Sequence, residues 1–291
     1  MSLVWELLSN PGAPLALREA GLERAHSDPG IPRREGSTAS FWLKDPHPTV
    51  ATARSQTWPE ETEFAIVGSG IAGLSVAHAL LTAGRDKPHT APRVVVLEAR
   101  DACSGATGRN GGHVIETGVD YLDLKHAFGQ DAATQIVRFR LSHLPALLAV
   151  AASVPGLRER SQLRQVEFVT AYYDQTAYEH ALASLAEFKA DMPAESREFR
   201  SHSQDVLKEK FHLSDYAVGA ISGPAGAAWP YRFVSGLWAA LLQDHASLQL
   251  ETNTPVSEIQ LDAHGQYTLH TPRGATCSLA CADAWCRCAG R

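Results

Sequence analysis

The chain has 291 residues, which suffices for one large domain or two ordinary ones, and its 44% hydrophobic and 20% charged residues exclude a disordered or fibrous protein. Its 26 basic and 32 acidic residues give a net charge of −6, so no global positive field is available to attract nucleic acid. The longest weakly polar run, residues 144–157, is interrupted by Ser153 and Pro155 and is shorter than a membrane helix needs. Together with the lack of a basic and apolar N-terminal signal, this predicts a soluble cytoplasmic protein that binds neither nucleic acid nor membrane.

The chain has five cysteines, and their positions argue against both disulfides and metal. Four of them lie within residues 277–288, which is not the spread of a secreted disulfide framework. Their spacing lacks the paired C-x2-C units of a structural zinc site, and no histidine lies nearby. We therefore expect no metal site.

The first 61 residues mix Pro, Ser, Arg and Glu and predict an irregular lead-in with one short helical stretch at residues 4–8. A strand at 64–67, stopped by glycine, and a helix at 71–83, ended by Gly84, follow. The continuous β-branched run at 94–97 predicts a second strand that is buried on both faces. These three elements form a βαβ unit.

The rest of the chain predicts a mixture of helices and strands. A glycine-rich stretch at 104–113 leads into a long region whose apolar spacing suits helices. Asp174 is expected to cap a helix in which Ala177, Ala181, Leu185 and Phe188 share a face. Strands are expected at 166–172, 217–222 (before the breakers of 223–226) and 248–251, a helix at 233–242, and a hairpin from 256–261 and 267–271.

The segment Gly68-Ser69-Gly70-Ile71-Ala72-Gly73 fits G-x-G-x-x-G between the first predicted strand and helix. In a dinucleotide site Gly68 permits the tight turn, Gly70 lets a pyrophosphate approach the backbone, and Gly73 lets helix and strand pack closely. The helix N-terminus supplies unpaired amides and partial positive charge. A glycine-rich turn without a ligand is the alternative interpretation.

Glu98 ends the second predicted strand, at the spacing after Gly73 expected for the acid that binds the ribose hydroxyls. A solvated carboxylate at the end of a strand is the alternative. The chain then continues into a second loop with four glycines, residues 104–113, which can line a long ligand with backbone amides. A nicotinamide domain would more usually run on into another helix, so FAD fits better.

These residues resemble the D-amino-acid-oxidase-like group of FAD-dependent oxidoreductases, which includes the sarcosine, glycine and γ-glutamylputrescine oxidases. The resemblance rests on GSGIAGLSVAHALL, VVVLEARDACSGATGRNGGH and WPYRFV followed by LETNTPV, and it spans about residues 64–269. It implies that residues 104–113 run along the pyrophosphate toward the flavin and that Val256 offers its backbone to the adenine. The candidate cofactor-binding residues are Gly68, Ser69, Gly70, Ile71, Ala72, Gly73, Glu98, Ala99, Arg100, Ser104, Gly105, Ala106, Thr107, Arg109, Asn110, Gly111, Gly112, His113 and Val256.

The resemblance implies an α/β fold: a FAD-binding, Rossmann-like βαβ domain with an inserted α+β substrate domain. We assign 1–61 to the lead-in, 62–118 and 224–276 to a discontinuous FAD domain, 119–223 to the insertion and 277–291 to a divergent Cys-rich tail. Relatives continue further, so we expect a C-terminally truncated chain with an unpaired sheet edge, half of the flavin pocket unwalled, and weak or absent turnover.

The implied reaction is oxidation of an amine or amino acid C–N bond to an imine, with dioxygen as the acceptor. We assign no catalytic residue. His113 is expected near the flavin ring, with a backbone-satisfied histidine as the alternative, and Arg232 is either a carboxylate fork or an ion pair. A nicotinamide-dependent dehydrogenase and a non-catalytic dinucleotide-binding fragment remain alternative functions. The substrate and the oligomeric state stay open.

Overall fold

The computed structural model describes residues 14–27, 36, 38–82 and 91–283. The chain divides into two units, residues 40–284 and the remainder. In the smaller unit, helix α2 (Leu15–His26) lies where the sequence predicts an irregular lead-in. The difference arises because this stretch, LALREAGLERAH, is rich in the strong helix formers Leu, Ala, Arg and Glu. The short helix expected at residues 4–8 and the helix stop at Gly84 lie outside the described residues.

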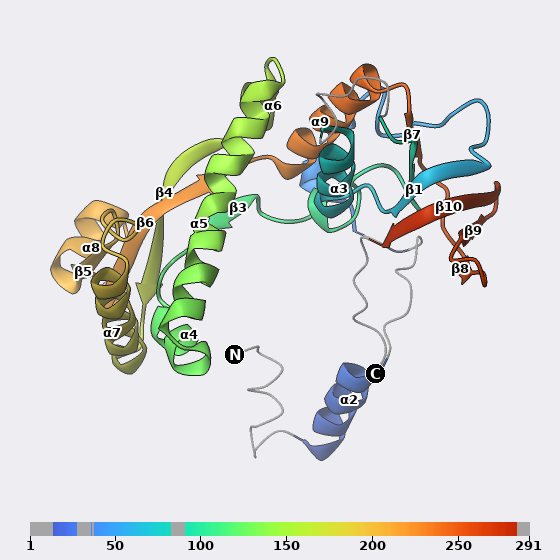
Figure 1. Cartoon of the computed structure of the whole chain (residues 1–291). Coiled ribbons are helices and arrows are strands. Elements are labelled where there is room, and N and C mark those ends of the chain that lie inside the picture. The colour runs from blue at the N-terminus through green and yellow to red at the C-terminus, as the bar shows by residue number, and fades with distance from the viewer. Residues whose placement is uncertain (1–13, 28–35, 37, 83–90, 284–291) are drawn as a thin grey trace. The chain divides into compact units, whose positions relative to one another are not determined.

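The larger unit contains a six-stranded sheet with the strand order β7-β2-β1-β10-β9-β8 (Figure 1). Strands β7, β2 and β1 are parallel, which confirms the predicted βαβ unit around helix α3. The hairpin predicted near the C-terminus is confirmed as β8 and β9. The bounds are β1 Glu61–Val67, α3 Ile71–Thr82, β2 Val94–Leu97, β7 Leu248–Glu251, β8 Glu258–Leu261, β9 Tyr267–Thr271 and β10 Gly274–Asp283.

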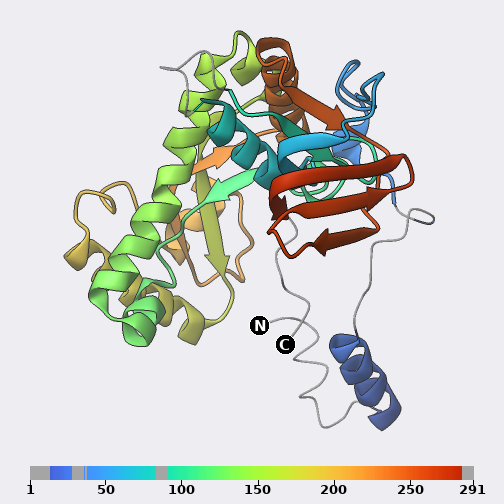
Figure 2. The same ribbon diagram turned by 45° about the vertical axis from the view of Figure 1, so that its right-hand side comes forward.

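Strand β10 differs from the expectation of a divergent tail and an unpaired edge. Its first half pairs antiparallel with β9, and its second half pairs parallel with β1, from Glu61 opposite Cys277 to Val67 opposite Asp283 (Figure 2). The composition of this segment hides a strand, because small residues and cysteines take the place of the usual Val and Ile. Backbone pairing with β1 therefore covers the edge that the sequence left open.

Two helices cover one face of this sheet (Figure 1). Helix α3 contributes Leu74 and Leu81, and helix α9 (Pro230–Asp244) contributes Val234 and Trp238, to a core that includes Val96 of β2. On the opposite face Leu269 of β9 packs on strands β1 and β2 in a smaller cluster. Because β2 is buried on both faces, its VVVL run reads as continuous rather than alternating.

A second sheet has the order β3-β6-β4, with β5 also paired to β6. Strand β6 continues through the predicted breaker at 223–226 and across the expected domain boundary at 223/224. Glycine is required at position 223 because a Cβ there would lie 2.8 Å from the rings of Phe168 and Phe199. The strands of the second sheet are β3 His113–Ile115, β4 Arg164–Tyr172, β5 Arg200–Ser203 and β6 Gly219–Ala227. The short 3-10 helices η1 Phe41–Leu43 and η2 Ala106–Gly108 contact α9 instead.

Helices pack against the second sheet, and the predicted cap is confirmed, since Asp174 accepts from the amide of Ala177 at 2.8 Å. Helix α5 is longer than the apolar run in the sequence indicates. By length and composition alone, it is the one helix among the described residues that could cross a membrane. This is weak evidence for a membrane span, because the core helix of a soluble protein passes the same test. The helices are α4 Tyr121–Phe128, α5 Gln130–Ser153, α6 Leu157–Ser161, α7 Gln175–Asp191 and α8 Gln204–Phe211.

Candidate functional site

The G-x-G-x-x-G segment forms the turn between β1 and α3, as the sequence predicts. The amide of Gly68 donates to the carbonyl of Leu97 at 2.8 Å, which joins the turn to the end of β2. A Cβ on Gly73 would lie 2.0 Å from the Gly68 carbonyl oxygen, so only glycine lets the helix pack this closely on the turn. In the first turn of α3 the amide of Ile71 donates to the hydroxyl of Thr107, while the amides of Ala72 and Gly73 have no acceptor within the helix, which suits this end to an anion.

Glu98 lies directly after β2 and faces this turn. Its Oε2 accepts from the amide of Ser69 at 3.0 Å and from the Ser69 hydroxyl at 2.6 Å, and its Oε1 accepts from the amide of Arg100 at 3.0 Å. A carboxylate has about four acceptor positions, so Oε1 keeps capacity for a ligand hydroxyl. The interpretation of Glu98 as a solvated strand-end carboxylate is wrong, because the residue is only 8% exposed. Its contact with ribose stays a prediction.

Ser69 is the centre of a buried polar cluster that the sequence does not reveal. Its hydroxyl accepts from the amide of Cys103 at 2.9 Å, and its carbonyl accepts from Nε1 of Trp238 at 2.8 Å. Burial, followed by the charge of Glu98, raises the pKa of the Cys103 thiol far above its usual range. The thiol therefore stays protonated and donates to the Ser69 carbonyl.

The second glycine-rich loop meets the first at Thr107. The hydroxyl of Thr107 accepts from the amide of Ile71 at 2.9 Å and so caps α3 from a loop 36 residues away. The hydroxyl of Ser104 is buried without a hydrogen-bond partner within the described residues. A buried orphan hydroxyl costs free energy unless a ligand or water pairs with it. This donor therefore fits a phosphate placed along the loop.

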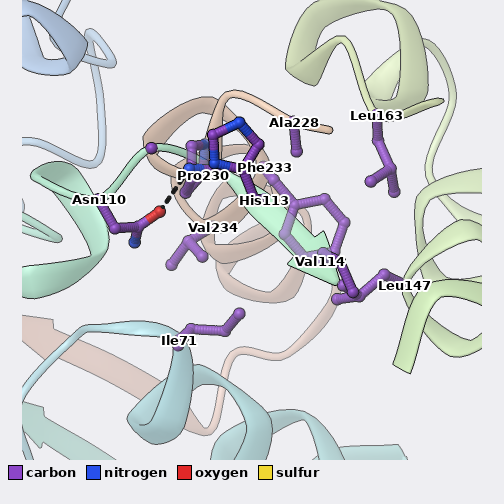
Figure 3. A pocket seen from close by; sticks show the side chains of 12 residues that line it. Ile71, Asn110, His113, Val114, Leu147, Leu163, Ala228, Pro230, Phe233 and Val234 are labelled. Atoms are coloured by element: carbon purple, nitrogen blue, oxygen red, sulfur yellow. Dashed lines mark hydrogen bonds between the residues drawn. The ribbon is translucent and has the colours of Figure 1, made fainter. Parts of the chain in front are cut away.

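A cavity of about 420 Å³ begins where this loop ends (Figure 3). Asn110 shapes the approach, because its Oδ1 accepts from the amide of Gly112 at 2.8 Å. His113 of β3 is exposed and lines the cavity, whose remaining walls are mainly apolar. Ile71 of α3 and Phe233 of α9 lie on its lining, so the cavity adjoins the N-terminus of α3. The other candidates on these loops are Gly70, Ala72, Ala99, Arg100, Gly105, Ala106, Arg109 and Gly111.

Val256 lies beyond β7, half-buried against the cluster that contains Val95 and Leu97. Within the described residues its backbone amide and carbonyl have no hydrogen-bond partner, so both are available to a ligand.

Arg232, the candidate for binding a substrate carboxylate, already has a partner. Its Nη2 lies 2.7 Å from Oδ2 of Asp45, and its guanidinium stacks on Trp229 at 3.8 Å. The ion-pair alternative is therefore confirmed, and Arg232 is absent from the cavity lining.

Among the described residues no group of three or more His, Cys, Asp or Glu side chains is placed to hold a metal. Cys286 and Cys288 lie outside that part of the chain.

Comparison with known proteins identifies related folds. Residues 63–291 match the family described as FAD dependent oxidoreductase. Similar solved structures are glycine oxidase from Geobacillus kaustophilus (19% identity, 77% of this chain and 55% of that chain, TM-score 0.59) and L-amino acid deaminase from Proteus vulgaris (14%, 79% and 55%, 0.60). L-alpha-glycerophosphate oxidase from Mycoplasma pneumoniae, solved with FAD bound, is also similar (17%, 76% and 53%, 0.55). No curated protein matches the sequence. The chain spans about half the length of these solved structures.

Proposed function

Because this chain belongs to the FAD-dependent oxidoreductase family, we propose that the whole protein oxidises the C–N bond of a small amine or amino acid, with dioxygen as the electron acceptor. The observation that carries the proposal is the continuity of the site. A helix N-terminus, a buried acid beside it and a second glycine-rich loop lead into one cavity next to His113. Two structurally similar proteins are named for reactions of glycine and of L-amino acids.

The residues present fit FAD. The amides of Gly70 and Ala72, with the buried hydroxyl of Ser104, would hold the pyrophosphate. Glu98 would accept from the ribose, and the backbone of Val256 would pair with the adenine. The cavity near His113 would take the isoalloxazine ring. The family match therefore favours FAD over the nicotinamide alternative.

FAD, when bound, would supply the oxidising chemistry by accepting a hydride, which carries both electrons of the oxidation, from the carbon next to the substrate nitrogen. The chain's own residues bind and orient. The apolar side chains of Leu147, Phe233 and Val234 exclude water from the cavity. Asn110 fixes the loop backbone at its mouth through Gly112. His113, which lines the cavity, would orient a substrate there.

The proposal is tested with the purified whole protein carrying FAD. Under anaerobic conditions, a panel of secondary amines, amino acids and L-alpha-glycerophosphate is added, and bleaching of the visible flavin band is followed. We expect bleaching by a nitrogen compound, and formation of peroxide when air is admitted. If only the glycerophosphate bleaches the flavin, the proposed oxidation of a C–N bond is wrong and oxidation of a C–O bond takes its place. Retained flavin without bleaching by any compound would favour the non-catalytic alternative.

A further inference from the structure

The segment Ser40–Trp58 lies immediately upstream of the family match, which begins at residue 63. We propose that this segment is a strap that holds two cofactor loops in their binding geometry and controls how tightly FAD is retained. These are the loop after β2, residues 98–112, which includes the second glycine-rich stretch, and the loop after β7, residues 252–257. The inference rests on the proposed FAD site and adds an element that the family match does not include.

The strap first joins the two loops at the adenosine end of the site. The carbonyl of Ala51 accepts from the amide of Ala102 at 2.9 Å, in the loop after β2. The carbonyl of Ala53 accepts from the amide of Thr252 at 2.9 Å and from its hydroxyl at 3.0 Å, in the loop after β7. The loops after β2 and β7 are thus both bonded to one upstream segment as well as to each other.

Arg54 and Ser55 add to this end. Arg54 is exposed, yet its Nε donates to the carbonyl of Thr252 at 3.0 Å and its Nη2 to that of Asn253 at 2.9 Å. The amide of Ser55 donates to Oε1 of Glu251 at 3.1 Å. Asn253 is a non-glycine residue with φ 51°, a conformation that needs support from its surroundings. Arg54 satisfies its carbonyl in that conformation.

At its other end the strap holds the second glycine-rich loop. The hydroxyl of Ser40 donates to the carbonyl of Gly108 at 2.6 Å. Leu43 packs so closely that a Cβ on Gly108 would lie 2.6 Å from its Cδ2. Trp42 stacks edge-on against Trp229 at 5.2 Å and accepts from its Nε1 at 2.8 Å. The strap therefore contacts the loop that leads to the cavity.

Between these ends the strap is anchored in the protein core. Val50 is completely buried among side chains of the larger sheet and its helices. The amide of His47 donates to the hydroxyl of Tyr231 at 3.0 Å, which ties the strap to α9. A segment fixed at its middle and bonded to the loops on either side restricts both loops before a ligand arrives. Such pre-organisation tightens binding by lowering the ordering cost.

The double variant Ser40→Ala/Arg54→Ala removes the Ser40 hydroxyl, which bonds to Gly108 and caps Trp42, and both Arg54 bonds to the loop after β7. It leaves the buried Val50 anchor intact. Each of the two substitutions is expected to weaken FAD binding about threefold, and the two sites are far enough apart for the effects to combine to about tenfold. Arg138→Ala is the matched control, because it removes an ion pair between Arg138 of α5 and Glu195 of the turn after α7, which contacts neither cofactor loop. Its FAD dissociation constant should equal that of the wild type.

Two readouts separate the strap from ordinary structural support. FAD raises the melting temperature by an increment that depends on its affinity. We expect a smaller increment in the double variant, whereas a variant that only weakens the fold lowers the apo and FAD-bound temperatures equally. Amide hydrogen exchange in the apo protein should become faster at Ala102 and Thr252. If the wild type binds no FAD, the proposed function fails. The exchange measurement still tests the strap in that case, because it is made on the apo protein. Unchanged exchange in the double variant overturns the strap, and so does a double variant that binds FAD as tightly as a wild type that binds it.

Discussion

The amide and the hydroxyl of Ser69 donate to the same oxygen of Glu98, at 3.0 and 2.6 Å. The acid that the sequence assigns to the ribose is therefore fixed by the second residue of the glycine motif, a position that the motif leaves undefined. The hydroxyl of Ser69 also accepts from the amide of Cys103, so one side chain links the turn, the acid and the following loop.

Ser69→Ala should weaken FAD binding about tenfold and lower the free energy of unfolding by about 2 kcal/mol, because a buried amide of Cys103 loses its acceptor and Glu98 loses a donor. Flavin fluorescence titration and urea unfolding measure the two effects. Ser75→Ala is the matched control, since that exposed hydroxyl bonds, among the described residues, to the carbonyl of Ile71 in its own helix alone. Equal behaviour of the two variants would remove the Ser69 link.

Gly73→Ala should destabilise the protein by about 3 kcal/mol, because the added methyl collides with a backbone oxygen that cannot move without opening the turn. Thermal unfolding of the apo protein measures this loss. Gly105→Ala is the comparison, because its Cβ would meet only the flexible end of Arg100, at 3.2 Å. A smaller loss for Gly73→Ala than for Gly105→Ala would refute the close approach of helix and turn.

Thr107→Val should cost about 1 kcal/mol of stability, because the valine keeps the shape but leaves the amide of Ile71 without its cap. Thr107→Ser retains the hydroxyl and should stay close to the wild type. Chemical unfolding followed by tryptophan fluorescence compares the three proteins. If serine and valine are equally destabilising, the hydroxyl is not the cap.

His202 predicts an acid sensitivity of the second sheet. Burial, followed by the charge of Lys210, lowers its pKa from 6.5, although Glu167 opposes this and Arg200 adds to it. The unfolded chain therefore binds more protons than the folded one below about pH 6.5, and stability falls as the pH is lowered through that value. His202→Gln should make this fall shallower in unfolding measured between pH 7 and pH 5. Identical slopes for the two proteins would contradict the shift.

The βαβ unit, the turn at Gly68 and the position of Glu98 are predictable because local patterns determine them: a buried strand, a glycine turn and a helix follow directly along the chain. Strand β10 is not predictable in the same way. Its cysteines and alanines carry little strand preference, and its place depends on pairing with β1 more than 200 residues earlier.

Long-range contacts also explain what the sequence misses in the site. Trp238 reaches Ser69 across 169 positions, and Arg54 reaches Asn253 across 199. No spacing rule joins such pairs. Arg232 is a case in which the sequence suggests a ligand-binding role that the structure does not support. Its guanidinium could bind a substrate carboxylate, but it is already paired with the carboxylate of Asp45.

The most direct test of the central claim is a titration of the apo protein with FAD, followed by quenching of flavin fluorescence, with ADP and NAD as competitors. The account predicts saturable binding of FAD, displacement by excess ADP, and weaker binding in Glu98→Ala, since the turn and the acid hold the adenosine diphosphate half. Absence of saturable FAD binding, or unchanged affinity in Glu98→Ala, would contradict it.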